Sequence, residues 1–591
     1  MNVRVYQQIL SSRRTFLRLA ALGSAGTLLA ACQPAAPAPA ATTAPAPTAA
    51  PKPAATAPAP AAPAATTAPA APAATTAPAA AATALPKPAA GGGTLNVYLY
   101  QKPKVFSPLP PFNGPDQQVM SLIFDNLVIV NDKYEYEGRL AEKWTISPDG
   151  KTFTFNLRKG LKWSDGTPFS SRDVLFTYKL LANEASGSGQ SAKFNNVKGV
   201  ADLRAGKDAA GLRAPDENTF VIELEQPNAA YMATIGGAWF WILPESVLGK
   251  VDLKDLANHP FFNKPTSGMG PYTFVRYETD QFVELARNPN YRTPVAIERM
   301  FLKPVTSDVA TAQLEKGEMQ LVQLSPTDIE RVSKLPGVKV ESKPGPGIIL
   351  MAMALEQPQW KDKRVRQAVL YAIDRAGLVK QVLAGQATIT NTHILGPSSA
   401  LPPDLVKYEY NPDKARSLLK EAGWDANRVA KIQWIKGQRD RDAAVEIIQA
   451  QLGQVGMKIE LNPLEAGPLL ENMKNQTFDF SLYGGGLYTV DPDSISVPTL
   501  CDQAYPKGGN NSRYCNPEVD ALMARGAATA DQAERAKIYQ QVAKITNDEV
   551  PYIWLYVPSA IWAYSDKLQG IKPHGEFTTG FWNAAEWSMR Q

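Results

Sequence analysis

The stretch "FDNLVIVNDKYEYEGRLAEKWTISPDGKTFTFNLRKGLKWSDGTPFSSRDVLFTYKLL", residues 124–181, carries a clear secondary-structure pattern. Every second residue from 153 to 157 is apolar, which is the period of a half-buried strand. The pairs Asp149-Gly150 and Asp165-Gly166 are typical of turns between strands. Ser170 or Ser171 can cap a helix that begins near residue 173. The stretch therefore predicts strands joined by tight turns, followed by a helix.

Helices and strands also alternate in the second half of the chain. The segment 411–424, "NPDKARSLLKEAGW", predicts a helix with an Asn cap, Pro in the first turn and Gly near its end. The segment 362–375, "DKRVRQAVLYAIDR", has the same apolar spacing. A strand, a helix and a strand over residues 431–461 indicate a βαβ unit. Such alternation predicts α/β architecture.

Nine phrases, in this order, resemble the extracellular solute-binding proteins of family 5. They are "LAEKW" (140–144), "SPDGKTFTFNLRKG" (147–160), "WSDGTPFSSRDV" (163–174), "APDENTFVIELEQPNAAY" (214–231), "SGMGPYTFVRYE" (267–278), "LARNPNYR" (285–292), "RVRQAVLYAIDR" (364–375), "NPDKARSLLKEAGW" (411–424) and "NPEVDALM" (516–523). Members of this family are the solute-binding components of bacterial ABC importers for peptides and related solutes.

The resemblance implies an α/β, two-lobed periplasmic-binding-protein fold of type II, with hinge-connected lobes. Lobe one is expected to hold residues 91–302 and 560–591, with the extra subdomain of the peptide-binding cluster from about residue 124. Lobe two is expected to hold residues 303–559. A solute then binds between the lobes, and hinge closure buries it.

The first 31 residues read as an export signal. They contain four arginines and no acidic residue, and their apolar run, 19–31, is shorter than the ~20 residues that a membrane-spanning helix needs. Residues 12–17, "SRRTFL", resemble a twin-arginine signal. Residues 29–32, "LAAC", resemble a lipobox, which implies that Cys32 is lipidated.

Residues 32–90 are rich in Ala, Pro and Thr, and contain no aromatic residue. Such a segment cannot bury a core, and its prolines favour an extended chain. We expect a disordered tether that holds an exported protein at the outer face of the cytoplasmic membrane, in the periplasm or at the cell surface.

The charge balance argues against a nucleic-acid partner. The chain has 61 Lys and Arg against 56 Asp and Glu, and four of the basic residues lie in the predicted signal. A nearly neutral mature chain has no electrostatic footprint for nucleic acid. Three distant histidines, and the lack of a nucleophile-elbow or zinc-protease motif, argue against an enzyme and a metal site. We expect no cofactor.

Besides Cys32, the chain contains only Cys501 and Cys515. In an exported protein this pair can form a disulfide that closes a small loop. Two unpaired thiols are the alternative.

Candidate ligand contacts come from aromatic residues in segments that the resemblance places at the cleft. The segments are "YLYQKPKVFSPL" (98–109), "GGAWFWILP" (236–244), the end of the strand at 431–435, and "YGGGLYTVDPDS" (483–494). The candidates are Tyr100, Phe106, Trp239, Trp241, Trp434, Tyr483, Tyr488 and Asp491. Aromatic side chains stack on solutes, but they also fill cores.

The loop before Asp491-Pro492 departs from the peptide-binding members. There the resemblance places an aspartate that pairs with the α-ammonium of the peptide, whereas this chain has Tyr488, or Thr489 in a shifted register. A tyrosine cannot replace that carboxylate electrostatically. Asp491 or Asp493 can substitute only if one points inward.

The sequence thus predicts a monomeric solute receptor that delivers its cargo to an ABC permease and its ATPases. A peptide is the first hypothesis for the cargo, and an oligosaccharide or another neutral solute is the alternative. A lipoprotein that presents a ligand to a receptor, or a structural lipoprotein of the cell envelope, is the competing class.

Overall fold

The computed structural model describes residues 93–109, 113–236, 239–394, 400–485, 491–495, 497–576 and 580–590. They all fall within one compact unit. The predicted signal (1–31), Cys32 and nearly all of the predicted tether lie outside the described residues. Within the described residues, no helix is both long and apolar enough to cross a membrane.

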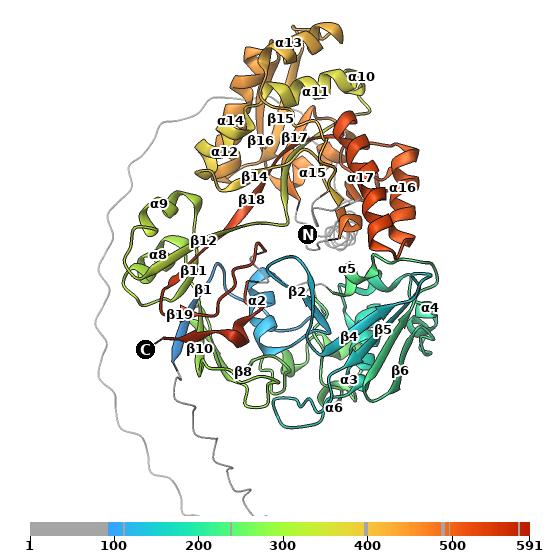
Figure 1. Ribbon diagram of the computed structural model, residues 1–591, viewed down its shortest axis with the longest axis vertical. Helices are drawn as coiled ribbons and strands as arrows, with labels where there is room; N and C mark the ends of the chain where they lie inside the picture. Colours follow the sequence, from blue (N-terminus) through green and yellow to red (C-terminus); the bar gives the residue numbers. More distant parts are fainter. Residues whose placement is uncertain are drawn as a thin grey trace, which may run out of the picture. The chain divides into compact units, whose positions relative to one another are not determined.

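A twelve-stranded sheet runs through the molecule (Figure 1). Its strands are β1 (Thr94–Leu99), β8 (Tyr272–Glu278), β9 (Phe282–Arg287), β10 (Arg299–Pro304), β11 (Leu321–Gln323), β12 (Val338–Pro344), β13 (Ile348–Met353), β14 (Ala387–Ile389), β15 (Val429–Ile435), β16 (Lys458–Leu464), β17 (Phe480–Gly485) and β18 (Tyr552–Ser565). The order is β16-β15-β17-β13-β18-β11-β1-β10-β9-β8, and β12 and β14 also pair with β18.

Lobe one combines the β1-β10-β9-β8 part of this sheet with a smaller antiparallel sheet. The smaller sheet has the order β4-β5-β7-β6, with β4 at Ala141–Ile146, β5 at Thr152–Leu157, β7 at Thr219–Glu223 and β6 at Leu212–Asp216. A hairpin of β2 (Val128–Val130) and β3 (Tyr136–Gly138) precedes it. The helices of lobe one are α2 (Gly114–Ile123), α3 (Ser171–Ala182), α4 (Val200–Arg204), α5 (Tyr231–Ile235), α6 (Glu245–Leu248) and α7 (Leu253–Leu256).

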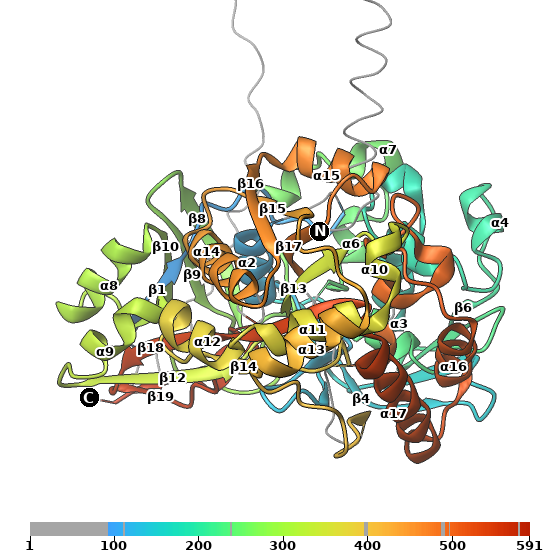
Figure 2. The ribbon, with the colours of Figure 1, turned by 90° about the horizontal axis from the view of Figure 1, so that it is seen from above.

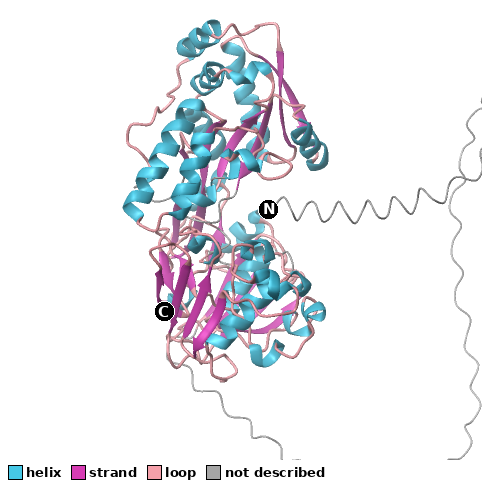
Figure 3. Ribbon diagram, turned by 90° about the vertical axis from the view of Figure 1, so that its right-hand side faces the viewer, coloured by secondary structure: helices cyan, strands magenta, loops and turns pink. Residues whose placement is uncertain are grey.

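Lobe two has helices on both faces of the β15-β16-β17 part of the sheet (Figure 3). The helices are α10 (Pro358–Lys361), α11 (Lys363–Ala372), α12 (Arg375–Leu383), α13 (Pro412–Glu421), α14 (Arg439–Gln454), α15 (Ala466–Asn475), α16 (Pro517–Ala528) and α17 (Gln532–Glu549). Side chains of α11, α13 and α14 form one core with β15, and side chains of α15 form another core on the opposite face.

The predicted local elements are present. In β5, Phe153, Phe155 and Leu157 are buried, and the alternate residues are partly exposed. Ser170, rather than Ser171, caps α3, because Ser170 and Asp173 form a reciprocal capping box. Asn411 caps α13 by accepting a hydrogen bond from the amide of Lys414. Strands β15 and β16 are parallel, with α14 between them in the chain, which confirms the βαβ unit.

Two strand connections join the lobes. In β18, residues up to Pro558 pair with β13 and β14, and residues from Ser559 pair with β12. The chain also passes from β12 to β13 through residues 344–347, "PGPG". The amide of Gly345 donates to the carbonyl of Pro558 at 2.9 Å, so the two crossings are hydrogen-bonded to each other.

One segment departs from the predicted lobe boundary. The sequence placed residues 303–559 in lobe two, but α8 (Ser307–Glu315), β11, α9 (Ile329–Val332) and β12 lie beside β1 (Figures 1 and 2). Ala310, Leu314 and Val332 form a core with Tyr98 of β1 and Ile561 of β18. The pairing of β11 with β1, and of β12 with the far end of β18, holds this segment on the lobe-one sheet.

Gly575 provides a test of the packing at the crossing. A Cβ atom on this residue would lie 1.9 Å from the carbonyl oxygen of Pro344 and 2.1 Å from the Tyr134 hydroxyl, which itself donates to that carbonyl at 2.5 Å. We expect Gly575→Ala to lower the free energy of unfolding by about 1–3 kcal/mol, as overpacking does. Urea titration followed by tryptophan fluorescence measures this change.

Gly453→Ala is the matched control. Gly453 lies in α14, where a Cβ atom added to this residue would point into open space. Alanine has the higher helix propensity, so we expect it to raise the free energy of unfolding by about 0.5–1 kcal/mol. Equal stability of the two variants would contradict the packing described at Pro344.

Candidate functional site

The candidate site begins at the carboxyl ends of the parallel strands in lobe two. Strand β15 is parallel to β16 and to β17, so the three strands end at one edge of the sheet. In open α/β sheets, ligands bind outside this edge. The loop that follows β17 contains Tyr488 and Thr489, and both lie outside the described residues.

The next described residue, Asp491, is bound to an arginine. Its Oδ2 and Oδ1 accept from Nη1 and Nη2 of Arg535, each at 2.6 Å, and only 9% of the residue is exposed. The Arg535 Nε donates to the carbonyl of Gly526, which fixes the guanidinium at α16. Asp491 therefore points inward, which is the condition for it to replace the missing aspartate. Its charge, however, is balanced by Arg535.

Asp493 lies beside this ion pair, and no described residue forms an ion pair with it. Its Oδ1 accepts a long hydrogen bond from the Tyr539 hydroxyl, at 3.3 Å, and its amide donates to Asp491 Oδ1. Burial and then the Asp491 carboxylate raise the pKa of Asp493 to about 6, while Arg535 opposes them. The group therefore titrates close to neutral pH.

Lobe one reaches this cluster through Tyr136 of β3. The hydroxyl of Tyr136 is buried, and no residue in the described part of the chain forms a hydrogen bond with it. Burial raises the pKa of Tyr136, Asp491 raises it further, and Arg535 lowers it, so the phenol lies within electrostatic range of the ion pair. A second contact joins the lobes nearby, where the amide of Ala229 donates to the carbonyl of Ala527 at 2.6 Å.

The aromatic candidates divide between surface and core. Phe106 is 2% exposed and packs against Phe274, and Trp434 is 5% exposed with its Nε1 donating to Asp442 at 2.6 Å. Trp241 is also buried. These three side chains fill cores, which leaves them little surface for a solute.

Tyr100, Trp239 and Tyr483 keep some accessible surface. Tyr100 lies directly after β1 and is exposed, and the Lys193 ammonium lies 3.8 Å from the ring centroid of Trp239. The residue Tyr483 belongs to β17 and packs at the edge of the core under α15. Burial raises the pKa of Tyr483, so its hydroxyl stays protonated at any physiological pH.

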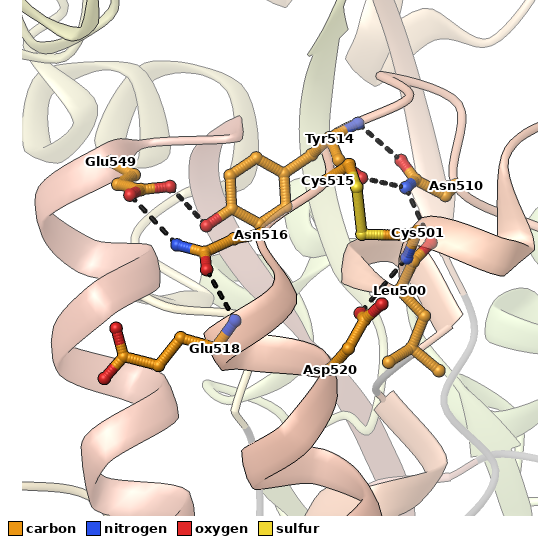
Figure 4. The surroundings of a disulfide bond; sticks show 9 residues. All are labelled: Leu500, Cys501, Asn510, Tyr514, Cys515, Asn516, Glu518, Asp520 and Glu549. Carbon is orange, nitrogen blue, oxygen red and sulfur yellow. Dashed lines mark hydrogen bonds between the residues drawn. A yellow bond between two sulfur atoms is a disulfide. The ribbon is translucent and has the colours of Figure 1, made fainter.

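Cys501 and Cys515 are joined by a disulfide, with their Cα atoms 4.4 Å apart (Figure 4). Within the closed loop, the Asn510 amide donates to the carbonyls of Leu500 and Tyr514, and its oxygen accepts from the Tyr552 hydroxyl. The disulfide loop is thereby bound to β18, next to the strands that carry the candidate site. Among the described residues, no group of His, Cys, Asp and Glu could hold a metal ion.

Sequence reasoning missed Tyr136 and Arg535. They lie 355 and 44 positions from Asp491 in the chain. Tyr136 falls within the stretch 124–181, but no local pattern marks it as a contact of Asp491, and Arg535 belongs to no recognisable motif. Their proximity follows from tertiary structure alone.

Asp491→Asn is expected to lower the free energy of unfolding by about 3–5 kcal/mol, because it leaves the Arg535 guanidinium buried without a counter-charge. Asp404→Asn breaks an exposed ion pair with Lys544, and should cost about 1 kcal/mol or less. Urea unfolding compares them; equal losses would rule out a structural role for the Asp491 charge.

Asp493→Asn tests the raised pKa. The pKa of this carboxyl is 3.8 in the unfolded chain and about 6 in the folded protein. Between these values the folded state binds the proton more strongly, so the free energy of unfolding falls as the pH rises from about 4 to above 6. The asparagine side chain cannot bind this proton, so the variant does not lose stability in this way. Its free energy of unfolding, compared with that of wild type, should rise by on the order of 2 kcal/mol between pH 4 and pH 7. Asp502→Asn removes a carboxyl group at an exposed position and is the matched control for the loss of one charge.

Comparison with known proteins places the chain in a family. Residues 135–506 match the middle region of the bacterial extracellular solute-binding proteins, family 5. A Brucella ovis protein provisionally named as an ABC transporter peptide-binding protein is 31% identical over 461 residues, which are 76% of this chain and 84% of that one. The Bacillus subtilis oligopeptide-binding protein AppA is 26% identical over 505 residues, covering 82% and 89% of the two chains.

Solved structures share the fold. The Listeria monocytogenes ABC transporter substrate-binding protein CtaP superposes with a TM-score of 0.75 at 23% identity, over 85% of this chain and all of that one. Bacillus subtilis AppA, in complex with a nonapeptide, gives a TM-score of 0.67 at 24% identity with the same coverage. The fold is therefore the two-lobed, type II periplasmic-binding-protein fold, and the chain belongs to the bacterial extracellular solute-binding proteins, family 5.

Proposed function

We propose that this protein is the substrate-binding component of an ABC importer, and that it captures a peptide between its two lobes for delivery to a membrane permease. The relatives named for peptide binding, which match most of the chain, carry this proposal. The glutathione-binding protein GsiB of Escherichia coli, 28% identical over 481 residues, adds a third relative named for a peptide-like solute.

The joined lobes support a hinge mechanism. Within the described residues, two connections cross between the lobes, at residues 344–347 and 557–559, so small backbone rotations there can change the distance between Tyr136 and Asp491. A solute drives closure only through contacts that improve when the lobes approach each other. In this proposal, Tyr100 and Trp239 contribute from lobe one, and Tyr483 and the loop with Tyr488 contribute from lobe two.

The ion pair between Asp491 and Arg535 favours a second candidate cargo. Because Arg535 balances Asp491, and because residue 488 is a tyrosine, neither residue offers a free carboxylate to an α-ammonium. Asp493 is the remaining carboxylate of this cluster, and burial favours its neutral form. A neutral solute such as an oligosaccharide needs no such carboxylate, and it can stack on aromatic residues.

The amino-terminal segment completes the proposal. Lipidation of Cys32 would anchor the protein at the outer face of the cytoplasmic membrane, and the tether up to residue 90 would give the binding lobes reach. Anchoring would raise the local concentration of the receptor near its permease. We propose that the receptor acts as a monomer.

Mass spectrometry of solutes released from the natively purified protein tests the cargo class. A peptide that is recovered should raise the melting temperature when added back, following RT ln(1 + [L]/Kd), and small-angle scattering should show compaction. Recovery of an oligosaccharide would favour the second candidate. If no solute is recovered, and none from peptide and oligosaccharide panels binds, the importer proposal fails.

Tyr488→Ala is expected to weaken binding of the recovered solute by about tenfold, because one stacking or hydrogen-bonding contact is lost. The melting temperature of the unliganded protein should not change. Tyr410→Ala, at an exposed position on lobe two, is the control and should bind like wild type. Isothermal titration calorimetry gives both affinities; unchanged affinity in Tyr488→Ala would remove this residue from the proposed site.

A further inference from the structure

The carboxyl end of α16 carries a backbone carbonyl that is hydrogen-bonded to the other lobe. The Ala527 carbonyl accepts from the amide of Ala229 at 2.6 Å, and Ala229 lies in lobe one just before α5, which is next to α16 in Figure 1. The last four carbonyls of a helix have no partner within the helix, so each needs one from elsewhere. At Ala527 this partner comes from lobe one, so the hydrogen bond exists only while the two lobes are in contact.

The two preceding carbonyls of α16 are satisfied within lobe two. The Arg525 carbonyl accepts from the Thr529 hydroxyl at 2.7 Å, and the Gly526 carbonyl accepts from Nε of Arg535 at 2.9 Å. Arg535 is itself held by the ion pair with Asp491. The end of α16 is therefore held in place by lobe two alone.

The lobe-one side of the contact consists of two turns that are hydrogen-bonded to each other. The Tyr231 amide donates to the Asn228 carbonyl at 3.0 Å, and the Asn228 amide donates to the carbonyl of Gly150, between β4 and β5, at 2.9 Å. A Cβ atom on Gly150 would lie 3.4 Å from the Ala528 carbonyl oxygen and 3.4 Å from the Ala229 amide nitrogen. Both turns of lobe one therefore lie against the end of α16.

This contact is made by main-chain atoms, and none of the candidate solute contacts belongs to it. Its donor and acceptor are both supplied by the protein, so the contact does not need a cargo in order to form. One hydrogen bond of this kind shifts an equilibrium by about two- to tenfold after the loss of hydration is counted. The contact therefore favours the state in which the lobes lie together.

We propose that the turns at 147–150 and 228–231 and the end of α16 at 527–528 form a latch, which holds the lobes together in the absence of cargo. The inference rests on the hinge of the proposed function, because a latch acts only where two lobes can separate. The apparent affinity of a receptor scales with the fraction of molecules in the binding-competent state. A latch that raises this fraction strengthens the binding of every solute by the same factor.

Ala229→Pro removes the donor and keeps the turn. Ala229 occupies the second position of the turn at 228–231, where proline is favoured, and Ala230 has a φ of −72° and a ψ of −6°, close to the third position of a type I turn. Ala426→Pro is the matched control. Ala426 occupies the same position in an exposed turn of lobe two, where the Arg428 amide donates to the Asp425 carbonyl at 3.1 Å.

Gly150→Asn is a second, independent variant that places a side chain in the contact. Gly150 has a φ of +67°, a conformation that asparagine tolerates better than most residues, and the new side chain would extend between Ala229 and Ala528. Gly160→Asn is its matched control, because Gly160 has a φ of +73° and no atom lies within 4 Å of a Cβ atom there. If one latch variant fails to fold, the other decides.

Hydrogen exchange and small-angle scattering of the unliganded proteins test the latch without a cargo. The Ala229 amide should exchange more slowly than the exposed Ala426 amide in wild type, and about two- to tenfold faster in Gly150→Asn than in wild type or Gly160→Asn. Both latch variants should have a larger radius of gyration than wild type and the two controls. Fast exchange of the Ala229 amide in wild type, or an unchanged radius in the folded latch variants, would overturn the inference.

Dissociation rates of the recovered solutes give a further test. Ala229→Pro and Gly150→Asn should release each solute about two- to tenfold faster than wild type, by the same factor for every solute. A factor that differs between solutes would mean that these residues contact the cargo, and would contradict the latch. If no solute binds wild type, the importer proposal fails, while exchange and scattering still decide whether the latch exists.

Discussion

Both lobes share one strand, and this constraint organises the whole molecule. Strand β18 forms antiparallel ladders with β13 and β14 on one side of Pro558, and with β11 and β12 on the other. The ladders to the two lobes meet between Pro558 and Ser559, and we expect a change in the angle between the lobes to occur there. The second connection between the lobes, the Pro-Gly-Pro-Gly segment at 344–347, passes beside Pro558 and is hydrogen-bonded to it.

The polar contact between the lobes depends on this shared strand. Asp491 and Arg535 form a buried pair in lobe two, and Tyr136 brings an unpaired hydroxyl from lobe one to within electrostatic range. A fully paired charge contributes little attraction to an incoming ion, whereas an unpaired one contributes much more. The charge of Asp491 is thus used inside the protein.

Much of the fold could be predicted from the sequence because its signals are local. The alternation in β5, the Asn cap of α13 and the βαβ unit around α14 each depend on neighbours in the chain. The boundary at residue 303 could not be placed in this way. Residues 306–340 have no local feature that distinguishes one lobe from the other, and only the pairing of β11 and β12 with β18 assigns them to the lobe-one sheet.

The candidate site was less predictable, because burial and charge pairing are properties of the assembled structure. Phe106 and Trp434 are aromatic residues near strand ends, as solute contacts would be, yet packing buries both. The sequence by itself determined the class of fold, the alternation of elements and the family resemblance, since these follow from short-range patterns and their order. Only the tertiary structure decided that Arg535 neutralises Asp491 and that the Ala229 amide donates to Ala527, because each pairing joins residues far apart in the chain whose distance no periodicity encodes.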